Sequence, residues 1–186
     1  MDDLTAIADD PGGEQYGRVA IALHWLTALL IVGSFTVGLS MVGLPLSRQK
    51  LQWYAWHKWI GITIFLLTCL RLAWRATHAM PRPLSTMPPW QRRASVLVHD
   101  ALYGLLLAVP LSGWIYSSST GVQVIYLGLV PLPDLVPKDR ELARALLALH
   151  LTLNFALFSL VCVHTAAALK HHFIDRDTVL TRMLPP

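Results

Sequence analysis

The sequence predicts an all-α fold, an integral membrane four-helix bundle with both termini cytoplasmic, and three observations support this. Hydrophobic residues make up 54% of the 186 residues, charged residues make up only 14%, and the mean hydropathy is +0.49. The hydrophobic share and the mean hydropathy are well above those of an ordinary soluble domain, and the charged share is well below. Four apolar stretches are long enough to cross a hydrocarbon core, which takes about 20 helical residues. The basic residues between the second and third stretches give the orientation.

The four expected helices cover residues 19–44, 56–74, 96–116 and 143–169. Between the second and third helices the chain reads RLAWRATHAMPRPLSTMPPWQRR, which carries five arginines and no acidic residue. Basic loops of membrane proteins stay on the cytoplasmic side, so this loop is expected inside. An even number of crossings then places both termini inside as well.

Five histidines fall within the expected helices: His24, His57, His99, His150 and His164. In the expected orientation His24, His99 and His164 lie near the cytoplasmic face, whereas His57 and His150 lie near the outer face. The fourteen residues between His150 and His164 correspond to about 21 Å along an α-helix, with both side chains within about 40° of each other around the axis. Ionisable groups inside a bilayer are costly and normally face the bundle interior and a functional partner.

Two neutral imidazoles that face each other across a bundle suit a six-coordinate haem iron, which takes one ring nitrogen at each axial position. Depth pairs His57 with His150 near the outer face. Near the inner face His24 pairs with His164, but His99 lies at a similar depth, so spacing alone leaves this second pair open. A single helix histidine is more often hydrogen-bonded packing. Zinc is a further alternative, although a structural zinc site uses four close ligands.

Four segments resemble the bacterial cytochrome b561 family, the di-haem membrane cytochromes related to the b subunits of hydrogenases and formate dehydrogenases. They are RVAIALHWLTALLI, WHKWIGITIFLLTCLRLAWR, HDALYGLLLAVPLSGW and, most specifically, VHTAAALKHHFIDRDTVLTRMLPP. The resemblance implies a single four-helix di-haem domain over residues 16–186. Residues 1–15 lie outside it, and we expect them to form a disordered tail. It also implies a multi-pass protein of the bacterial inner membrane.

The family pattern implies the ligand set as well. A histidine early in each of the first two helices and two in the fourth correspond here to His24, His57, His150 and His164. The implied pairs of axial ligands are His24 with His164 on the inner side and His57 with His150 on the outer side, which excludes His99. The implied cofactors are two haem b, with ubiquinone as the electron acceptor.

The best-described activity of the family is oxidation of superoxide at the periplasmic side with reduction of ubiquinone. Six basic and three acidic residues on the expected outer surface leave an excess of three positive charges, which favours an anionic donor. Lys58 adjoins His57 and is therefore the residue expected to steer superoxide. The alternative is that basic residues near a membrane only anchor to headgroups. The residues counted are Arg48, Lys50, Lys58, Lys138, Arg140 and Arg144 against Asp134, Asp139 and Glu141.

Three functions are thus open at this stage. The first is a superoxide:ubiquinone oxidoreductase. The second is a cytochrome b subunit that relays electrons from a docked hydrogenase or dehydrogenase. The third, from another class, is a haem-free structural or metal-binding bundle. The expected partners are membrane lipid, quinone and superoxide, with a redox protein in the second case and no nucleic acid in any.

Overall fold

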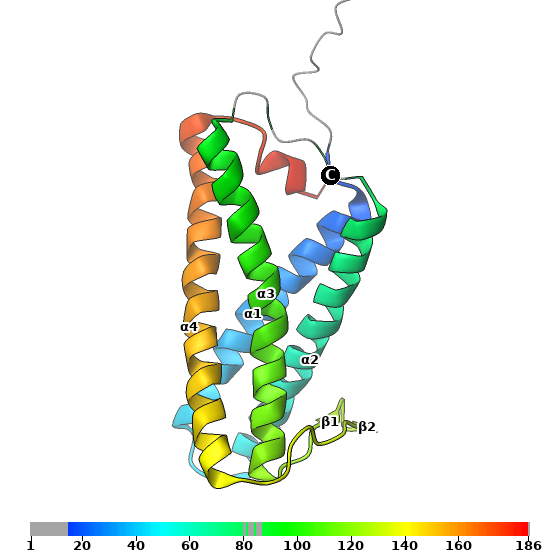
Figure 1. Ribbon diagram of the computed structural model, residues 1–186, viewed down its shortest axis with the longest axis vertical. Helices are drawn as coiled ribbons and strands as arrows, with labels where there is room; N and C mark the ends of the chain where they lie inside the picture. The colour runs from blue at the N-terminus through cyan, green and yellow to red at the C-terminus, as the bar shows by residue number, and fades with distance from the viewer. Residues whose placement is uncertain (1–14, 80, 82–83, 85–86, 186) are drawn as a thin grey trace, which may run out of the picture.

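The computed structural model describes residues 15–79, 81, 84 and 87–185, and these residues form four long helices (Figure 1). The helices are α1 (Arg18–Gly43), α2 (Arg48–Thr77), α3 (Pro89–Thr120) and α4 (Arg140–Lys170). Each is long and apolar enough to span a membrane, which confirms the four predicted spans. The two sides of the membrane and the tail stay predictions, since all but one residue of the expected tail lies outside the described residues.

The helices begin earlier than the apolar stretches indicate, and polar side chains cap the first turns of α2 and α4. Ser47 precedes α2, and its side chain accepts a hydrogen bond from the backbone N–H of Lys50. Asp139 precedes α4 and accepts from the backbone N–H groups of Glu141 and Leu142. Such caps satisfy amide groups that have no partner within the helix. Pro89 begins α3, where its missing N–H costs nothing.

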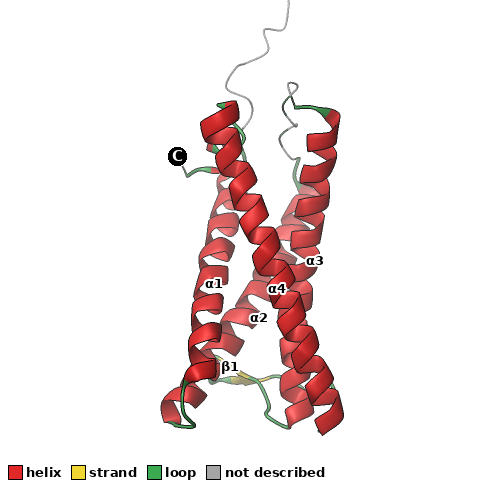
Figure 2. Cartoon of the chain, turned by 90° about the vertical axis from the view of Figure 1, so that its left-hand side faces the viewer, coloured by secondary structure: helices red, strands yellow, loops and turns green. Residues whose placement is uncertain are grey.

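Consecutive helices pack side by side with alternating direction, so the start of α1 and the end of α4 lie at the same end of the bundle (Figures 1 and 2). We call this the terminal end and the opposite one the hairpin end. At the terminal end a π-helical turn, η1 (His171–Asp175), and a short 3₁₀ helix, η2 (Thr181–Met183), follow α4. The indole N–H of Trp25 donates to the carbonyl of Met183 over 2.8 Å, which ties the C-terminal segment to α1.

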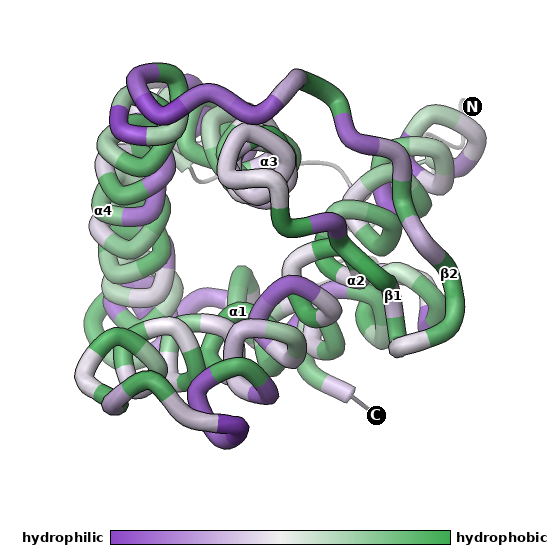
Figure 3. The backbone as a smooth tube through the Cα atoms, turned by 90° about the horizontal axis from the view of Figure 1, so that it is seen from below, coloured by the Kyte–Doolittle hydropathy of each residue, from purple (hydrophilic) through white to green (hydrophobic). Residues whose placement is uncertain are grey.

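The hairpin end departs from the all-α prediction. Two short antiparallel strands, β1 (Ile125–Tyr126) and β2 (Val130–Pro131), form a hairpin between α3 and α4. Figure 3 shows it beside α2. The indole N–H of Trp59 donates to the Ile125 carbonyl over 2.7 Å, and the Thr63 and Tyr126 hydroxyls lie 3.0 Å apart.

The buried core lies midway between the two ends. Ile64 of α2, Leu106 and Val109 of α3 and Leu157 of α4 form one cluster, and partly buried residues of α1 pack against it. Outside this cluster many large apolar side chains are exposed on the helices, such as Phe155 at 74%. An apolar exterior of this kind suits surrounding lipid. The core therefore separates two interior regions, one at each end of the bundle.

Candidate functional site

Two pairs of half-buried histidines occupy these two regions. At the hairpin end His57 of α2 faces His150 of α4, with their ring centroids 6.3 Å apart. At the terminal end His24 of α1 faces His164 of α4, also with ring centroids 6.3 Å apart. The structure thus brings together the four histidines singled out in the sequence, in the two expected combinations. We call these pairs the hairpin-end site and the terminal-end site.

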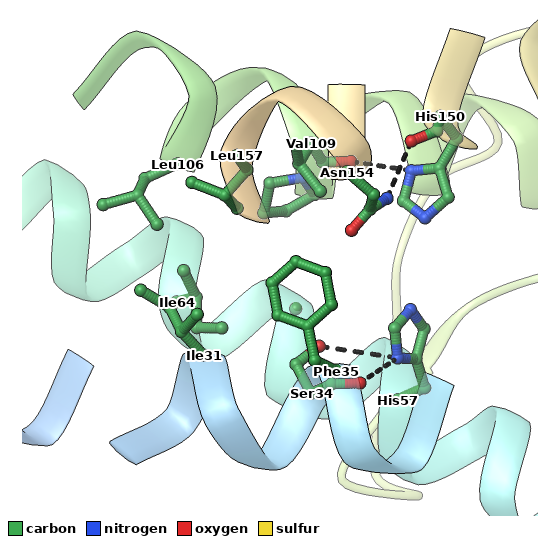
Figure 4. A pocket seen from close by; sticks show the side chains of 12 residues that line it. Ile31, Ser34, Phe35, His57, Ile64, Leu106, Val109, His150, Asn154 and Leu157 are labelled. Carbon is green, nitrogen blue, oxygen red and sulfur yellow. Dashed lines mark hydrogen bonds between the residues drawn. The ribbon is translucent and has the colours of Figure 1, made fainter. Parts of the chain in front are cut away.

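Oxygen atoms of neighbouring helices orient both rings of the hairpin-end site (Figure 4). Nδ1 of His57 lies 3.2 Å from the carbonyl oxygen of Ser34. Nδ1 of His150 lies 3.1 Å from the carbonyl oxygen of Val109 and 2.9 Å from Oγ of Ser112. A carbonyl oxygen only accepts, so Nδ1 of each ring carries the proton. Nε2 is then unprotonated, and in both rings it points toward the other ring across the gap (Figure 4).

Two glycines make room for these rings. A Cβ atom added at Gly38 of α1 would lie 3.1 Å from Cε1 of His57, and one added at Gly113 of α3 would lie 3.0 Å from Cε1 of His150. Both distances are shorter than ordinary carbon contacts of about 3.5–4.0 Å. Each glycine therefore lets an imidazole lie directly against a helix backbone.

The terminal-end site has a different electrostatic environment. Arg71 of α2 reaches His24, with its Nη2 atom 3.3 Å from Nδ1 of the ring. The same guanidinium lies over the ring of Tyr103 of α3, 5.3 Å from its centroid. A cation thus lies beside this pair. The rings of the hairpin-end site, in contrast, contact carbonyl oxygens. The prediction had counted Arg71 with the basic loop, but it lies within α2 and is half-buried.

His99 also lies at the terminal end, but its position differs from that of the paired histidines. Its ring centroid is 5.2 Å from that of His164, its Nδ1 lies 2.7 Å from the carbonyl oxygen of Ser95 on its own helix, and the residue is exposed. The nitrogen–carbonyl contact is the ordinary arrangement of a histidine packed on its own helix.

The ring separations test whether a metal fits between the pairs. A metal bonded to two imidazole nitrogens at about 2 Å each, with each nitrogen about 1 Å from its own ring centre, separates the ring centres by about 6 Å. His57 with His150 and His24 with His164 meet this requirement at 6.3 Å. The 5.2 Å between His99 and His164 is too short for it. The unprotonated Nε2 atoms of the hairpin-end site provide the chemistry that an axial ligand needs.

The space beside the hairpin-end site is apolar. A cleft with a volume of about 40 Å³ lies between the four helices. Its wall is formed by side chains or backbone of Ile31, Ser34, Phe35, His57, Gly61, Ile64, Leu106, Val109, Pro110, His150, Asn154 and Leu157. A mostly apolar wall with two imidazoles is typical of a site for a large hydrophobic cofactor.

Lys58 lies at the hairpin end, as expected, but it is half-buried. Its ammonium group donates to Oγ of Ser117 near the end of α3 over 2.7 Å. Among the other basic residues of this end, Arg144 forms an ion pair of 2.6 Å with Glu141. Within the described chain, Lys58 has no carboxylate at ion-pair distance, so its charge is not neutralised there.

Comparisons with known proteins show the family of the chain. A family model described as prokaryotic cytochrome b561 matches residues 15–186. Cytochrome b561 homolog 2 of Escherichia coli is 37% identical over 175 residues, which cover 92% of each chain. The chain belongs to the prokaryotic cytochrome b561 family. This cytochrome b561 protein is also similar to cytochrome b561 homolog 1 of Escherichia coli, at 29% identity over 92% of this chain and 97% of the relative. A protein of Yersinia pestis named probable superoxide oxidase CybB is 28% identical, over 92% and 97%.

Membership confirms the family resemblance seen in the sequence and has direct consequences. This cytochrome b561 protein is a bacterial membrane protein that binds b-type haem and transfers electrons. The haem-free bundle is therefore excluded. Sequence reasoning missed the groups that orient the rings, namely Ser34, Ser112, the Val109 carbonyl, Gly38, Gly113 and Arg71. Of these, Arg71 carries a sequence signal, since it follows His57 by fourteen residues on α2, the spacing that separates His150 and His164 on α4.

Proposed function

We propose that His57 and His150 hold one haem b at the hairpin end and that His24 and His164 hold a second at the terminal end. One observation carries this proposal: two half-buried histidine pairs with the same ring separation of 6.3 Å lie at opposite ends of one bundle. Bound haem supplies an iron that takes up and releases one electron at a time. The bundle then serves to move electrons from one of its ends to the other.

In this proposal the hairpin end faces the periplasm, and the terminal end faces the cytoplasm, across the bacterial inner membrane. The support is the distribution of basic residues, because residues 71–93, from the last turns of α2 to the first turn of α3, carry five arginines and no acidic residue. The end of α2 and the start of α3 lie at the terminal end, together with the start of α1 and the end of α4 (Figure 1).

The reaction we propose is oxidation of superoxide at the hairpin end and reduction of ubiquinone in the membrane. Two superoxide anions each lose one electron and become two O₂, and one ubiquinone takes up these two electrons with two protons and becomes ubiquinol. The name of the Yersinia pestis relative supports the donor. The excess of positive charge at the hairpin end supports it independently, because it favours encounter with a small anion. Arg48, Lys50, Lys58, Lys138, Arg140 and Arg144 there outnumber Asp134, Asp139 and Glu141.

The decisive experiment measures ubiquinol formation by the purified protein in liposomes that contain ubiquinone. Superoxide generated outside the liposomes is expected to reduce the quinone, and superoxide dismutase is expected to suppress the reaction. A relay subunit of a hydrogenase or dehydrogenase predicts a different result: no superoxide-dependent quinone reduction, and a stable complex with its partner in membrane extracts. That result would replace the proposed reaction, while leaving the two haem sites in place.

Lys58 supplies a finer prediction about superoxide encounter. The variant Lys58→Gln removes the charge beside His57 but keeps a hydrogen-bond donor near Ser117. We expect a slower reaction with superoxide and a weaker dependence on salt, because added salt shortens the Debye length from about 30 Å at 0.01 M to about 10 Å at 0.1 M. The measurement is the rate of haem reduction by superoxide at several ionic strengths, with unchanged haem content.

Lys138 provides the control for this prediction, because it is exposed and lies in the segment before α4. The variant Lys138→Gln is expected to change the rate less than Lys58→Gln does. Wild-type rate and wild-type salt dependence in Lys58→Gln would reject steering by this residue and favour headgroup anchoring.

A further inference from the structure

We propose that Arg71 raises the reduction potential of the terminal-end haem above that of the hairpin-end haem, so that electrons move downhill from the hairpin end to the terminal end. This inference rests on the ligand pairs of the proposed function. It identifies Arg71 as a residue that tunes that site through its charge. Its grounds are the charge, the contacts and the surroundings of the guanidinium.

The guanidinium lies over the Tyr103 ring and close to the ring of His24. Its Nη2 atom lies 3.3 Å from Nδ1 of His24, and its central carbon lies 5.3 Å from the centroid of the Tyr103 ring. A cation over an aromatic face is attracted by the ring quadrupole. The position also follows from α2 itself, because a spacing of fourteen residues puts Arg71 within about 40° of the helix face that carries His57. One face of α2 therefore carries a histidine at one site and an arginine at the other.

The charge of Arg71 has no acidic partner in the part of the chain that the structure describes. Its neighbour one turn later, Arg75, lies 3.9 Å from a carboxylate oxygen of Asp100, so the two arginines differ in this respect. Arg71 is half-buried, and a partly buried charge acts more strongly on its surroundings than an exposed one. The terminal-end site thus contains a positive charge that the protein around it does not balance.

A nearby positive charge favours the reduced form of a haem, since oxidation adds a further positive charge to the iron. The hairpin-end rings have the opposite influence. The Nδ1–H groups of His57 and His150 donate to carbonyl oxygens, which raises the basicity of the ring and favours the oxidised iron. Both effects increase the difference between the sites in the same direction.

Lys58, which directly follows the ligand His57 in the chain, is a cation at the hairpin end that opposes this difference. Its ammonium group is bonded to Ser117 in the last turn of α3, where the helix carbonyl groups carry partial negative charge. This local negative charge offsets part of the lysine charge. Arg71, in contrast, touches a histidine ring of its site directly. The balance therefore leaves the higher potential at the terminal end.

The test is a spectroscopic redox titration of the purified haem-loaded protein. The variant Arg71→Gln is expected to shift one of the two reduction steps to lower potential and to leave the other unchanged. The expected size is a tenfold or greater fall in the ratio of reduced to oxidised haem at a fixed ambient potential, or about 59 mV for one electron. Arg75→Gln is the matched control, because it removes a charge one turn away that is already paired, and it is expected to shift neither step by this amount.

A second variant, His57→Ala, shows which haem the shifted reduction step belongs to. His57→Ala is expected to remove the hairpin-end haem, so the remaining step belongs to the terminal end, and Arg71→Gln in this background is expected to lower it. Retention of two haems in His57→Ala would contradict the proposed ligands, which is a separate failure from an unshifted step. If Arg71→Gln loses haem, Arg71→Lys decides, because it keeps the charge and is expected to keep the potential near that of the wild type. A retained terminal-end haem with wild-type potential in Arg71→Gln, or a tenfold shift in Arg71→Lys, would overturn the proposal.

Discussion

Replacement of His57 or His150 by alanine is expected to leave the protein with one haem per chain instead of two. Either change removes one of two axial nitrogens from the hairpin-end site, and the remaining ring faces an open position. The terminal-end site lies on the other side of the apolar core cluster and shares no histidine with it. The measurement is the ratio of haem to protein in the purified variants, with the absorbance spectrum of the haem that remains.

The terminal-end site predicts the converse result and provides the control. His24→Ala or His164→Ala is expected to remove the other haem and leave the hairpin-end haem in place. His99→Ala is expected to keep both, because its ring lies too close to His164 for a metal in between and bonds its own helix. Two haems per chain in any of the four ligand variants, or the loss of one in His99→Ala, would contradict the assigned pairs.

The membrane spans and the depth of the histidines could be predicted because both follow from distances along a helix. A run of apolar residues is detected in the sequence, and fourteen residues separate two side chains by a known rise and rotation. The predicted helix starts lie too late in the chain because an apolar run marks only the part of a helix inside the hydrocarbon. The apolar run ends at the hydrocarbon boundary, whereas α2 and α3 continue into polar first turns at Arg48 and Pro89.

The groups that orient the rings could not be predicted, because they depend on how two helices face each other. Ser34 becomes a partner of His57 only through the packing of α1 on α2, and the Val109 carbonyl reaches His150 only through the packing of α3 on α4. Neither residue has an unusual neighbourhood in the sequence. The hairpin between α3 and α4 could not be predicted for a related reason. Its two short strands contact α2 through Trp59 and Thr63, which are far away in the chain.

The glycines that contact the histidine rings could not be predicted from the sequence either. Gly61 and Gly104 follow His57 and His99 closely in the sequence. A Cβ atom at Gly104, however, would meet nothing within 4 Å, and at Gly61 it would meet only Pro110 at 4.0 Å. The glycines that touch imidazole rings are Gly38 and Gly113, each on a different helix from its histidine. Contact across a helix interface, rather than spacing along one helix, therefore decides which glycine matters.

Gly113→Val is expected to remove most of the haem from the hairpin-end site while the terminal-end haem stays bound. The new Cβ atom alone would lie 3.0 Å from Cε1 and 3.4 Å from Nδ1 of His150, and the two added methyl groups need further space. The ring cannot move away without losing its hydrogen bonds to Ser112 and to the Val109 carbonyl, which belong to the same segment of α3. Displacement of the ring also turns Nε2 away from His57. Haem content and the spectrum of the remaining haem measure this effect.

Gly104→Val on the same helix is the matched control, because it adds the same side chain where the structure has open space. It is expected to keep both haems, so a general effect of valine in α3 is separated from the contact with His150. The equivalent comparison on α1 is Gly38→Val, beside the ring of His57, against Gly33→Val, which meets nothing within 4 Å. The two contact variants act through different helices on opposite rings, yet both are expected to empty the same site. Full haem content in Gly38→Val and Gly113→Val would show that the rings tolerate displacement, and that the close packing of glycine against imidazole is not what holds the hairpin-end pair in position.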